Sequence, residues 1–458
     1  MLRDVIKPVI SSVISDVLGS VSVLALFATG EIGLWFDTTD ITTLYQDIAG
    51  AIPITAPGQT VALMKDKSGR NNHATQPTAA QRPTYGVIPY GGIRNLANGS
   101  GAVGDINYWT STNTVNGVTA TRIATGIDTD GLPYADFTIS GTCTATSAIV
   151  LYANRNNSRF LTPTGTVCTS SVIARRISGP AQPFNCGVRA EAYGETSPGN
   201  TINEAYNGNL VDSATDTMST VSPTLVNAAT NQMSGQVTFR SELGATVNAT
   251  YRVKGFQLEK AAARSAFQLN LSKYNVTEAG KASLGVLYPD GIDDWMVTPS
   301  INFSGTDKVT IWAGLQKMSD AARGILVELG PPTATGSFAI NAPTGTGIAS
   351  YGFSSTGTAS SFANSVLFAA PIVSVLTGIG DISGDRATLQ VNGSQVAQAT
   401  TDQGTGNYSN NPIYLFRRGG ASLPFNGPFT GLIVRGAAST PSQIKDGNTY
   451  INSKLGAY

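Results

Sequence analysis

Three aspartates stand close together in one short segment of the sequence. Asp290, Asp293 and Asp294 lie in the run PDGIDDW. Carboxylates are hard oxygen ligands, so a cluster of this kind is a candidate Ca²⁺ site. Aspartates also cap tight turns by accepting hydrogen bonds from nearby backbone N–H groups, and glycine favours such turns. We interpret the segment as a turn leading into a strand and expect no bound metal, with these three residues as the Ca²⁺ candidates.

Aromatic residues beside polar ones are the candidates for sugar binding. A saccharide site combines an aromatic face for stacking with amide or carboxylate hydrogen bonds around it. The candidates are Tyr108, Trp109, Tyr193 and Tyr206. For Trp109 we favour a place in a hydrophobic core over a role as a stacking platform. Tyr193 and Tyr206, in a polar segment that contains glycine, are the better solvent-facing candidates, although a protein interface uses tyrosine just as readily.

The other reactive residues are not spaced for catalysis. Glu191 and Glu195 are four residues apart in EAYGE, which we interpret as a polar turn rather than a pair of glycosidase carboxylates. His73 is the single histidine, so no second histidine can share a metal with it, and we expect a structural residue in a loop. The sequence therefore predicts no enzymatic activity and no cofactor.

The composition points to an all-β protein of two or three domains. The chain has 458 residues, 50 of them glycine, and only 13% are charged. Runs of Thr, Ser, Val and Ile punctuated by Gly, Asn and Pro predict short strands joined by tight turns. The formal net charge is zero, so the sequence has no excess of positive charge that would favour binding to nucleic acid or to an anionic membrane.

The cysteines indicate a protein made in a reducing compartment. Cys143, Cys168 and Cys186 are an odd number and lack CxxC spacing, so neither a full disulfide framework nor a typical metal site is expected. We interpret them as small buried hydrophobic residues, although one pair could still form a bridge. Few cysteines without a disulfide framework suit a cytoplasm.

Local sequence patterns predict several secondary-structure elements. Residues 308–317 (KVTIWAGLQK) alternate as a strand that directs Val309, Ile311 and Leu315 inward. Asn392-Gly393 lies between two alternating runs, which predicts a β-hairpin. We expect a further strand at residues 21–27 and a terminal helix or turn at residues 442–455.

The N-terminal segment is predicted to be a short helix. Residues 8–18 place an apolar face on one side, formed by Val9, Ile10, Val13, Ile14, Val17 and Leu18. Asp16 and Gly19 interrupt the apolar stretch, so we expect no membrane span. A helix of this length is marginal alone and must dock. It either packs on its own domain or, as we favour, serves in self-association or attachment.

Two separated parts of the chain carry a family resemblance. GLWFDTTDITTLYQD, DKSGRNNHATQ, PDGIDDWMVTPSI and GLIVRGAA resemble the concanavalin A-like (laminin-G-like) lectin domains of bacteriophage virion proteins. Between them, RNLANGSGAVGDINYWT and FQLE resemble the opening and closing of jelly-roll carbohydrate-binding modules in phage tail proteins.

The resemblance implies an all-β fold with a discontinuous domain. A concanavalin A-like β-sandwich is interrupted by a second, jelly-roll β-sandwich, and a short N-terminal helix precedes both. The expected bounds are 1–22 for the attachment or oligomerisation helix, 23–91 and 268–458 for the lectin-like domain, and 92–267 for the inserted module. An insertion of this size is tolerated where it enters at a surface loop.

The same resemblance implies a virion structural protein, assembled in the host cytoplasm and displayed on the particle. The expected role is a tail or head fibre component that contributes to adhesion to host-surface glycans. Such proteins are commonly homotrimers that join other virion proteins through the N-terminus. The alternative is a purely architectural decoration protein of the head or tail that contacts no receptor.

Overall fold

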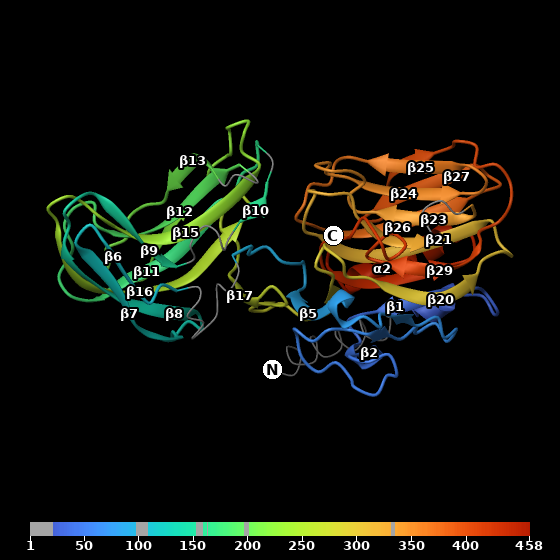
Figure 1. Ribbon diagram of the computed structural model, residues 1–458, viewed down its shortest axis with the longest axis horizontal. Helices are drawn as coiled ribbons and strands as arrows, with labels where there is room; N and C mark the ends of the chain where they lie inside the picture. The colour runs from blue at the N-terminus through green and yellow to red at the C-terminus, as the bar shows by residue number, and fades with distance from the viewer. Residues whose placement is uncertain (1–21, 98–108, 153–158, 163, 197–200, 331–334) are drawn as a thin grey trace, which may run out of the picture. The chain divides into compact units, whose positions relative to one another are not determined.

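The structure is a computed structural model that describes residues 22–97, 109–152, 159–162, 164–196, 201–330 and 335–458. Strands dominate it and helices are few, which confirms the predicted all-β sandwich class (Figure 1). The chain divides into two compact units. Unit 1 contains the residues up to Gly86, Tyr90–Gly92 and Leu284–Tyr458, and unit 2 contains Val87–Pro89 and Ile93–Ser283.

Unit 1 is built from two sheets. Along one sheet the strands are β5 (Thr84–Pro89), β19 (Ser283–Tyr288), β30 (Phe429–Arg435), β21 (Lys308–Lys317), β26 (Ile372–Asp381), β27 (Arg386–Val391) and β28 (Ser394–Ala399), and β1 (Gly33–Asp37) also pairs with β30. Along the other they are β2 (Leu44–Tyr45), β3 (Leu63–Met64), β4 (Ala74–Thr75), β20 (Met296–Asn302), β29 (Asn410–Leu415), β22 (Ile325–Leu329), β23 (Ser337–Asn341), β24 (Tyr351–Thr356) and β25 (Ser360–Ser365).

The core of unit 1 lies between these sheets. β24 and β25 pack on β27 and β28, and the buried side chains there include Phe353, Ala363 and Leu389 together with Ser355 and Ser361. Val309, Ile311 and Leu315 of β21 are fully buried, in agreement with the predicted strand. The expected hairpin is also present, because Asn392 and Gly393 adopt φ values of 52° and 76° between β27 and β28. Two successive positive φ angles are what a tight hairpin turn requires.

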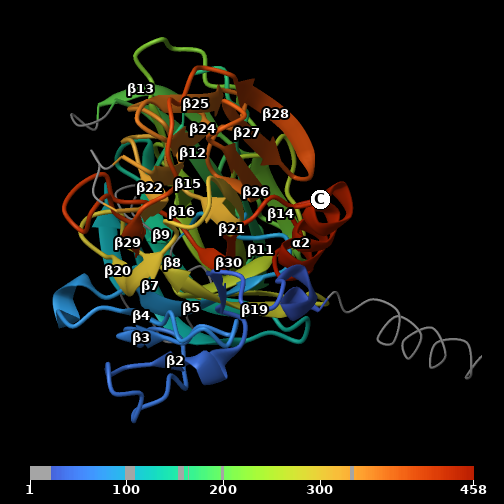
Figure 2. The ribbon, with the colours of Figure 1, turned by 90° about the vertical axis from the view of Figure 1, so that its right-hand side faces the viewer.

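Helix α2 (Pro441–Ser453) covers part of the first sheet. It contacts β21, β26 and β30 (Figure 2). Its N-terminus is a capping box, in which the Thr440 hydroxyl accepts a hydrogen bond from the Gln443 N–H and the Gln443 side chain accepts one from the Thr440 N–H. Gly447 allows close approach, since a Cβ there would lie 2.5 Å from the Trp312 ring. The predicted terminal helix is therefore confirmed.

The segment after residue 21 is not the strand that we expected. It forms a 3-10 helix, η1 (Val23–Leu26), and the short 3-10 helices η2 (Ile41–Thr43) and η3 (Ala79–Gln81) follow along the chain. Val23 and Leu26, three residues apart, share one face of the helix and pack in the cluster that contains Trp312. The predicted N-terminal helix of residues 8–18, with its face Val9, Ile10, Val13, Ile14, Val17 and Leu18, lies outside the described residues.

Unit 2 is a second sandwich. One sheet runs β14 (Thr217–Val221), β11 (Thr169–Ser178), β16 (Thr246–Glu259), β8 (Pro133–Thr142), β7 (Val118–Ile127) and β6 (Thr112–Val115). The other runs β10 (Phe160–Leu161), β15 (Gln232–Ser241), β12 (Gly187–Glu195) and β13 (Ile202–Asn207), with β9 (Ser147–Tyr152) paired to β15. Apolar side chains from both sheets form one core.

Unit 2 ends later than the sequence predicted. Its last strands, β17 (Gln268–Ser272) and β18 (Asn275–Glu278), form a hairpin, and Asn275 pairs with Val87. The Gln268 side-chain oxygen accepts hydrogen bonds from the backbone N–H groups of Arg94 and Asn95, at 2.6 and 3.0 Å. These bonds join the beginning of unit 2 to its end, so the unit reaches Ser283 rather than residue 267.

Candidate functional site: a polar face on strands β12 and β15

An organised polar face in unit 2 follows from the alternation of one strand. On β12, Ala190 and Ala192 are fully buried in the core. Successive strand residues point to opposite faces. Arg189, Glu191, Tyr193 and Glu195 therefore share the other face of the sheet. The neighbouring strand β15 adds Gln236 opposite Glu191, Ser234 opposite Tyr193 and Gln232 opposite Glu195.

Glu191 is the centre of the first group of hydrogen bonds. Arg189 donates to Glu191 Oε1 through Nε and Nη2, at 2.8 and 2.6 Å. The Tyr193 hydroxyl donates to Glu191 Oε2 at 2.5 Å. Gln236 Nε2 donates to the same oxygen at 2.6 Å and lies 2.9 Å from the Tyr193 hydroxyl oxygen. This network holds the tyrosine ring in one orientation on a face lined by a guanidinium, a carboxylate and an amide.

Glu195 is the centre of a second group on the same face. Its side chain is fully buried, and it accepts hydrogen bonds from Arg159 Nε at 2.7 Å and from the Ser234 hydroxyl at 2.6 Å. The sequence interpretation of Glu191 and Glu195 as part of a turn is wrong, because both lie on β12. Four residues of strand separate their Cα atoms by about 13 Å. Each carboxylate is engaged in an ion pair with its own arginine.

The hydroxyl of Tyr193 is a stable hydrogen-bond donor. Burial raises the pKa of Tyr193 well above its ordinary value, and the negative charge of Glu191 raises this pKa further. The phenol therefore remains protonated at neutral pH. The arrangement offers an aromatic ring with donors and acceptors beside it, which is the chemistry that recognises sugar hydroxyl groups.

The other aromatic candidates do not join Tyr193. Trp109 is only 3% exposed, and its ring centroid lies 4.2 Å from that of Tyr152 in the core, so its face is not open to a ligand. Tyr206 on β13 lies opposite Ala192, which directs it to the other side of the sheet from Tyr193. Its hydroxyl donates to Glu204. Tyr108 lies outside the described residues.

The sequence analysis did not single out Arg189, Gln236 or Ser234, and it placed Glu191 and Glu195 in a turn. A signal for them was present in GVRAEAYGE, where larger polar or aromatic residues alternate with small ones. That period of two is typical of a strand with one buried face. The partner residues on β15 have no such local signal, since only strand pairing brings them beside β12.

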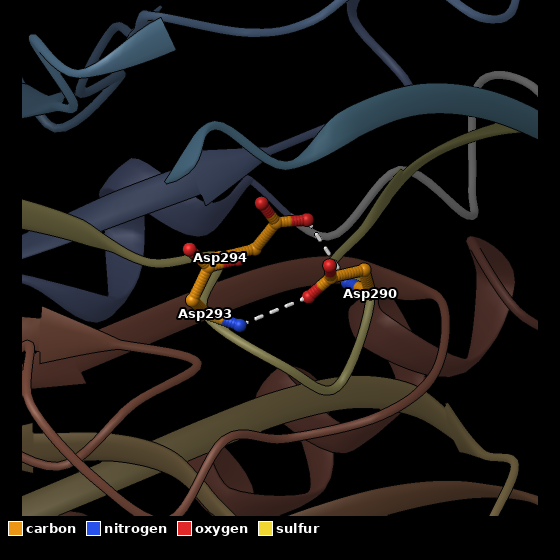
Figure 3. Close-up of side chains that lie close together, drawn as sticks. All are labelled: Asp290, Asp293 and Asp294. Atoms are coloured by element: carbon orange, nitrogen blue, oxygen red, sulfur yellow. Dashed lines mark hydrogen bonds between the residues drawn. The ribbon is translucent and has the colours of Figure 1, made fainter. Parts of the chain in front are cut away.

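The aspartate cluster is organised as a turn. The Asp290 N–H donates to Asp294 Oδ2 at 2.9 Å, while Asp290 Oδ1 accepts from the N–H groups of Ile292 and Asp293 at 2.8 and 3.2 Å (Figure 3). Gly291 in the same turn has a φ of 77°. The carboxylate oxygens lie within 4.8 Å of one another, but those of Asp290 and Asp294 already accept backbone hydrogen bonds of this turn before β20. We therefore assign no metal to Asp290, Asp293 and Asp294.

The remaining reactive side chains, those of His73 and the three cysteines, contribute to the fold. His73 Nδ1 accepts a hydrogen bond from the Asp66 N–H at 3.0 Å. Cys143, Cys168 and Cys186 are buried free thiols. In the part of the chain that the structure describes, no helix has the length and apolar character needed to cross a membrane.

Comparison with known proteins shows only distant likenesses. No protein-family model and no curated protein sequence matches this chain. Among solved structures, the CBM40 of Ruminococcus gnavus IT-sialidase bound to α2,3-sialyllactose is 17% identical over 31% of this chain and 82% of its own, with a TM-score of 0.26.

Two further solved structures have similarly low sequence identities and TM-scores. Domain 4 of AbnA, a GH43 arabinanase from Geobacillus stearothermophilus in complex with arabinotriose, is 13% identical over 36% of this chain and 81% of its own, with a TM-score of 0.24. The botulinum neurotoxin serotype C1 binding domain is 10% identical over 35% of this chain, with a TM-score of 0.27. This chain matches 41% of the length of that domain.

Proposed function

We propose that this protein binds a glycan through the polar face of β12 and β15 in unit 2. The observation that supports the proposal is the fixed group of Tyr193, Glu191 and Gln236 on one face of the sheet. The tyrosine ring offers an apolar surface to a sugar ring, while the amide of Gln236 and the guanidinium of Arg189 bind its hydroxyls, and the buried Glu191 holds all three in place. The role is binding rather than catalysis, because the carboxylates of this face are tied to arginines.

The biological setting that we propose is the surface of a bacteriophage particle. The sequence resemblance to phage concanavalin A-like domains and carbohydrate-binding jelly rolls supports it. In this proposal the N-terminal residues join other virion proteins, and the protein acts as a homotrimeric tail or head fibre component. Several copies on one particle would convert weak contacts with sugars into useful avidity. The architectural alternative remains a protein that decorates the head or tail without touching a receptor.

A glycan array with the purified protein tests the binding role. For a glycan that binds, Tyr193→Ala is expected to weaken the affinity about tenfold, since it removes the stacking surface. Tyr274→Ala, in the same unit but on the β17–β18 hairpin, is the matched control and should leave the affinity unchanged. If no glycan binds, or if Tyr193→Ala binds like the unmodified protein, the proposed site is wrong.

Particle incorporation tests the virion role. Deletion of residues 1–20 is expected to give a folded protein that is absent from purified particles, whereas the full chain is present. Incorporation of the shortened protein would contradict attachment through the N-terminus. Release of reducing sugar from host polysaccharide by the purified protein would contradict the non-catalytic role.

A further inference from the structure

Unit 1 has a hollow on one face of its second sheet. The hollow has a volume of about 500 Å³ and is lined by residues of β22 to β25 and by the segments beside them. Small-molecule sites have volumes of this order. Glu328, Ala339, Ser354 and Phe362 lie directly opposite one another in a row across four strands, so they share one face.

The floor of the hollow is made of small and hydroxylated side chains. β23 contributes Ser337 and Ala339, β24 contributes Ser354 and Thr356, and β25 contributes Ser360. Short side chains leave space above the sheet. The serine and threonine hydroxyls among them can both donate and accept hydrogen bonds. A surface of this kind suits a polyhydroxylated ligand.

An aromatic ring forms one side of the hollow. Phe362 is 41% exposed, an unusual degree for a phenylalanine on a sheet. Its ring lies flat enough on β24 that a Cβ at Gly352 would come within 2.5 Å of it. The glycine therefore allows the ring to lie against the strand, where one face is available for stacking with a sugar ring.

A charged group forms the opposite side. Arg418 Nε donates to Glu328 Oε1 at 3.0 Å. Glu328 is only 4% exposed, and its second oxygen, Oε2, has no hydrogen-bond partner among the described residues. A buried carboxylate oxygen without a donor is costly. Because this oxygen has almost no accessible surface, Glu328 holds Arg418 in place rather than contacting a ligand.

Arg323 leaves the hollow with an excess positive charge. Its Nε and Nη2 donate to the neutral side-chain oxygen of Asn341, at 3.0 and 2.8 Å. Within the described residues no carboxylate forms an ion pair with Arg323, whereas Arg418 is paired with Glu328. The two guanidinium groups face a single carboxylate. A planar guanidinium is well suited to bind a carboxylate of a ligand.

We propose that this hollow is a second ligand-binding site, specific for a carboxylated saccharide. Arg323 binds the carboxylate of the sugar, the hydroxyls of the floor bind sugar hydroxyls, and Phe362 stacks on the sugar ring. The site is independent of the β12–β15 face of unit 2, because none of its residues belongs to that unit.

Titration calorimetry on the full chain tests this site. The probes are oligosaccharides of galacturonic and glucuronic acid, each paired with its methyl ester, in which a neutral and slightly larger group replaces the carboxylate. The acids are expected to bind at least about tenfold more tightly than the esters, because one charge-assisted contact is lost in the ester. Arg323→Gln should abolish this difference, and Phe362→Ala should weaken acid and ester alike.

The controls separate this site from the first. Arg386→Gln removes a partly exposed arginine of β27, on the other sheet, and should leave binding of the acids unchanged. Tyr193→Ala should also leave binding of the acids unchanged. The experiment therefore distinguishes loss of binding in the hollow from loss of binding at the β12–β15 face. Thermal unfolding of each variant shows whether it is folded. The proposal is overturned if no acid binds, if acids and esters bind equally, or if folded Arg323→Gln still prefers the acids.

Discussion

Trp109 illustrates how a single aromatic residue contributes to the core of unit 2. Its ring packs against Tyr152 and lies 5.9 Å, centroid to centroid, from Phe137. Tyr152 in turn contacts Phe256 on the facing sheet. Tyr193, in contrast, lies on the outer face of its strand and forms polar contacts. The two residues therefore differ in role because of the faces they occupy.

Replacement of Trp109 by alanine should destabilise the protein without acting on the glycan site. We expect Trp109→Ala to lower the free energy of unfolding by about 3 to 5 kcal/mol, because it leaves a large cavity among buried aromatic rings. Urea unfolding followed by circular dichroism measures this loss. A loss below about 1 kcal/mol would show that the indole is not part of a packed core.

Among the strands, β16 carries the most concentrated charge network. Lys254 is 1% exposed, and its ammonium group lies 2.8 Å from Asp128, 2.7 Å from Asp130 and 2.6 Å from Asp216. Arg252 of the same strand also pairs with Asp128, at 3.1 Å. Burial alone would raise the pKa of Asp128, but hydrogen bonds from Lys254 and from the backbone outweigh it and hold this pKa well below its ordinary value.

The lowered pKa of Asp128 predicts acid sensitivity of unit 2. A carboxylate with a lower pKa in the folded state stabilises the fold above its unfolded pKa, about 3.9, and this contribution is lost as the pH falls toward the folded pKa. We expect Asp128→Asn to be less stable than the unmodified protein at pH 7 and to lose less additional stability between pH 4 and pH 2. Urea unfolding midpoints at several pH values measure this, and parallel pH profiles would contradict it.

For the whole molecule, the main feature is that unit 1 is formed by parts of the chain on both sides of unit 2. Each unit has its own core, so unit 2 should fold when it is expressed alone. The position of its end matters, because Gln268 satisfies the backbone N–H groups of Arg94 and Asn95. Asn95 is fully buried, so loss of these bonds would leave polar groups unsatisfied.

Two fragments test this organisation. Residues 87–283 are expected to give a β-rich circular dichroism spectrum and a cooperative unfolding transition. Residues 87–267, which end where the sequence placed the boundary, should unfold at a lower urea concentration because they lack β17, β18 and Gln268. Equal midpoints would show that the hairpin does not contribute to unit 2, and an unfolded longer fragment would contradict its independence.

Local sequence patterns were sufficient to predict the elements that depend on neighbouring residues. Alternation identified β21, Asn392-Gly393 identified the β27–β28 hairpin, and the composition identified an all-β chain. These features are local, because a strand period or a turn requires only a few adjacent residues. The same local reasoning failed at residues 21–27, where packing against Trp312 selected a 3-10 helix instead.

Which side chains come into contact depends on how the strands pair in three dimensions. Tyr193 and Tyr206 are both tyrosines of polar segments, yet strand register places them on opposite faces of one sheet. Arg323 and Arg418 are far apart in sequence, and the pairing of β22 with β29 brings them to one hollow. Strand pairing joins distant segments, and a shift of one residue would reverse every face. The binding surfaces therefore depend on register, which no short stretch of the sequence contains.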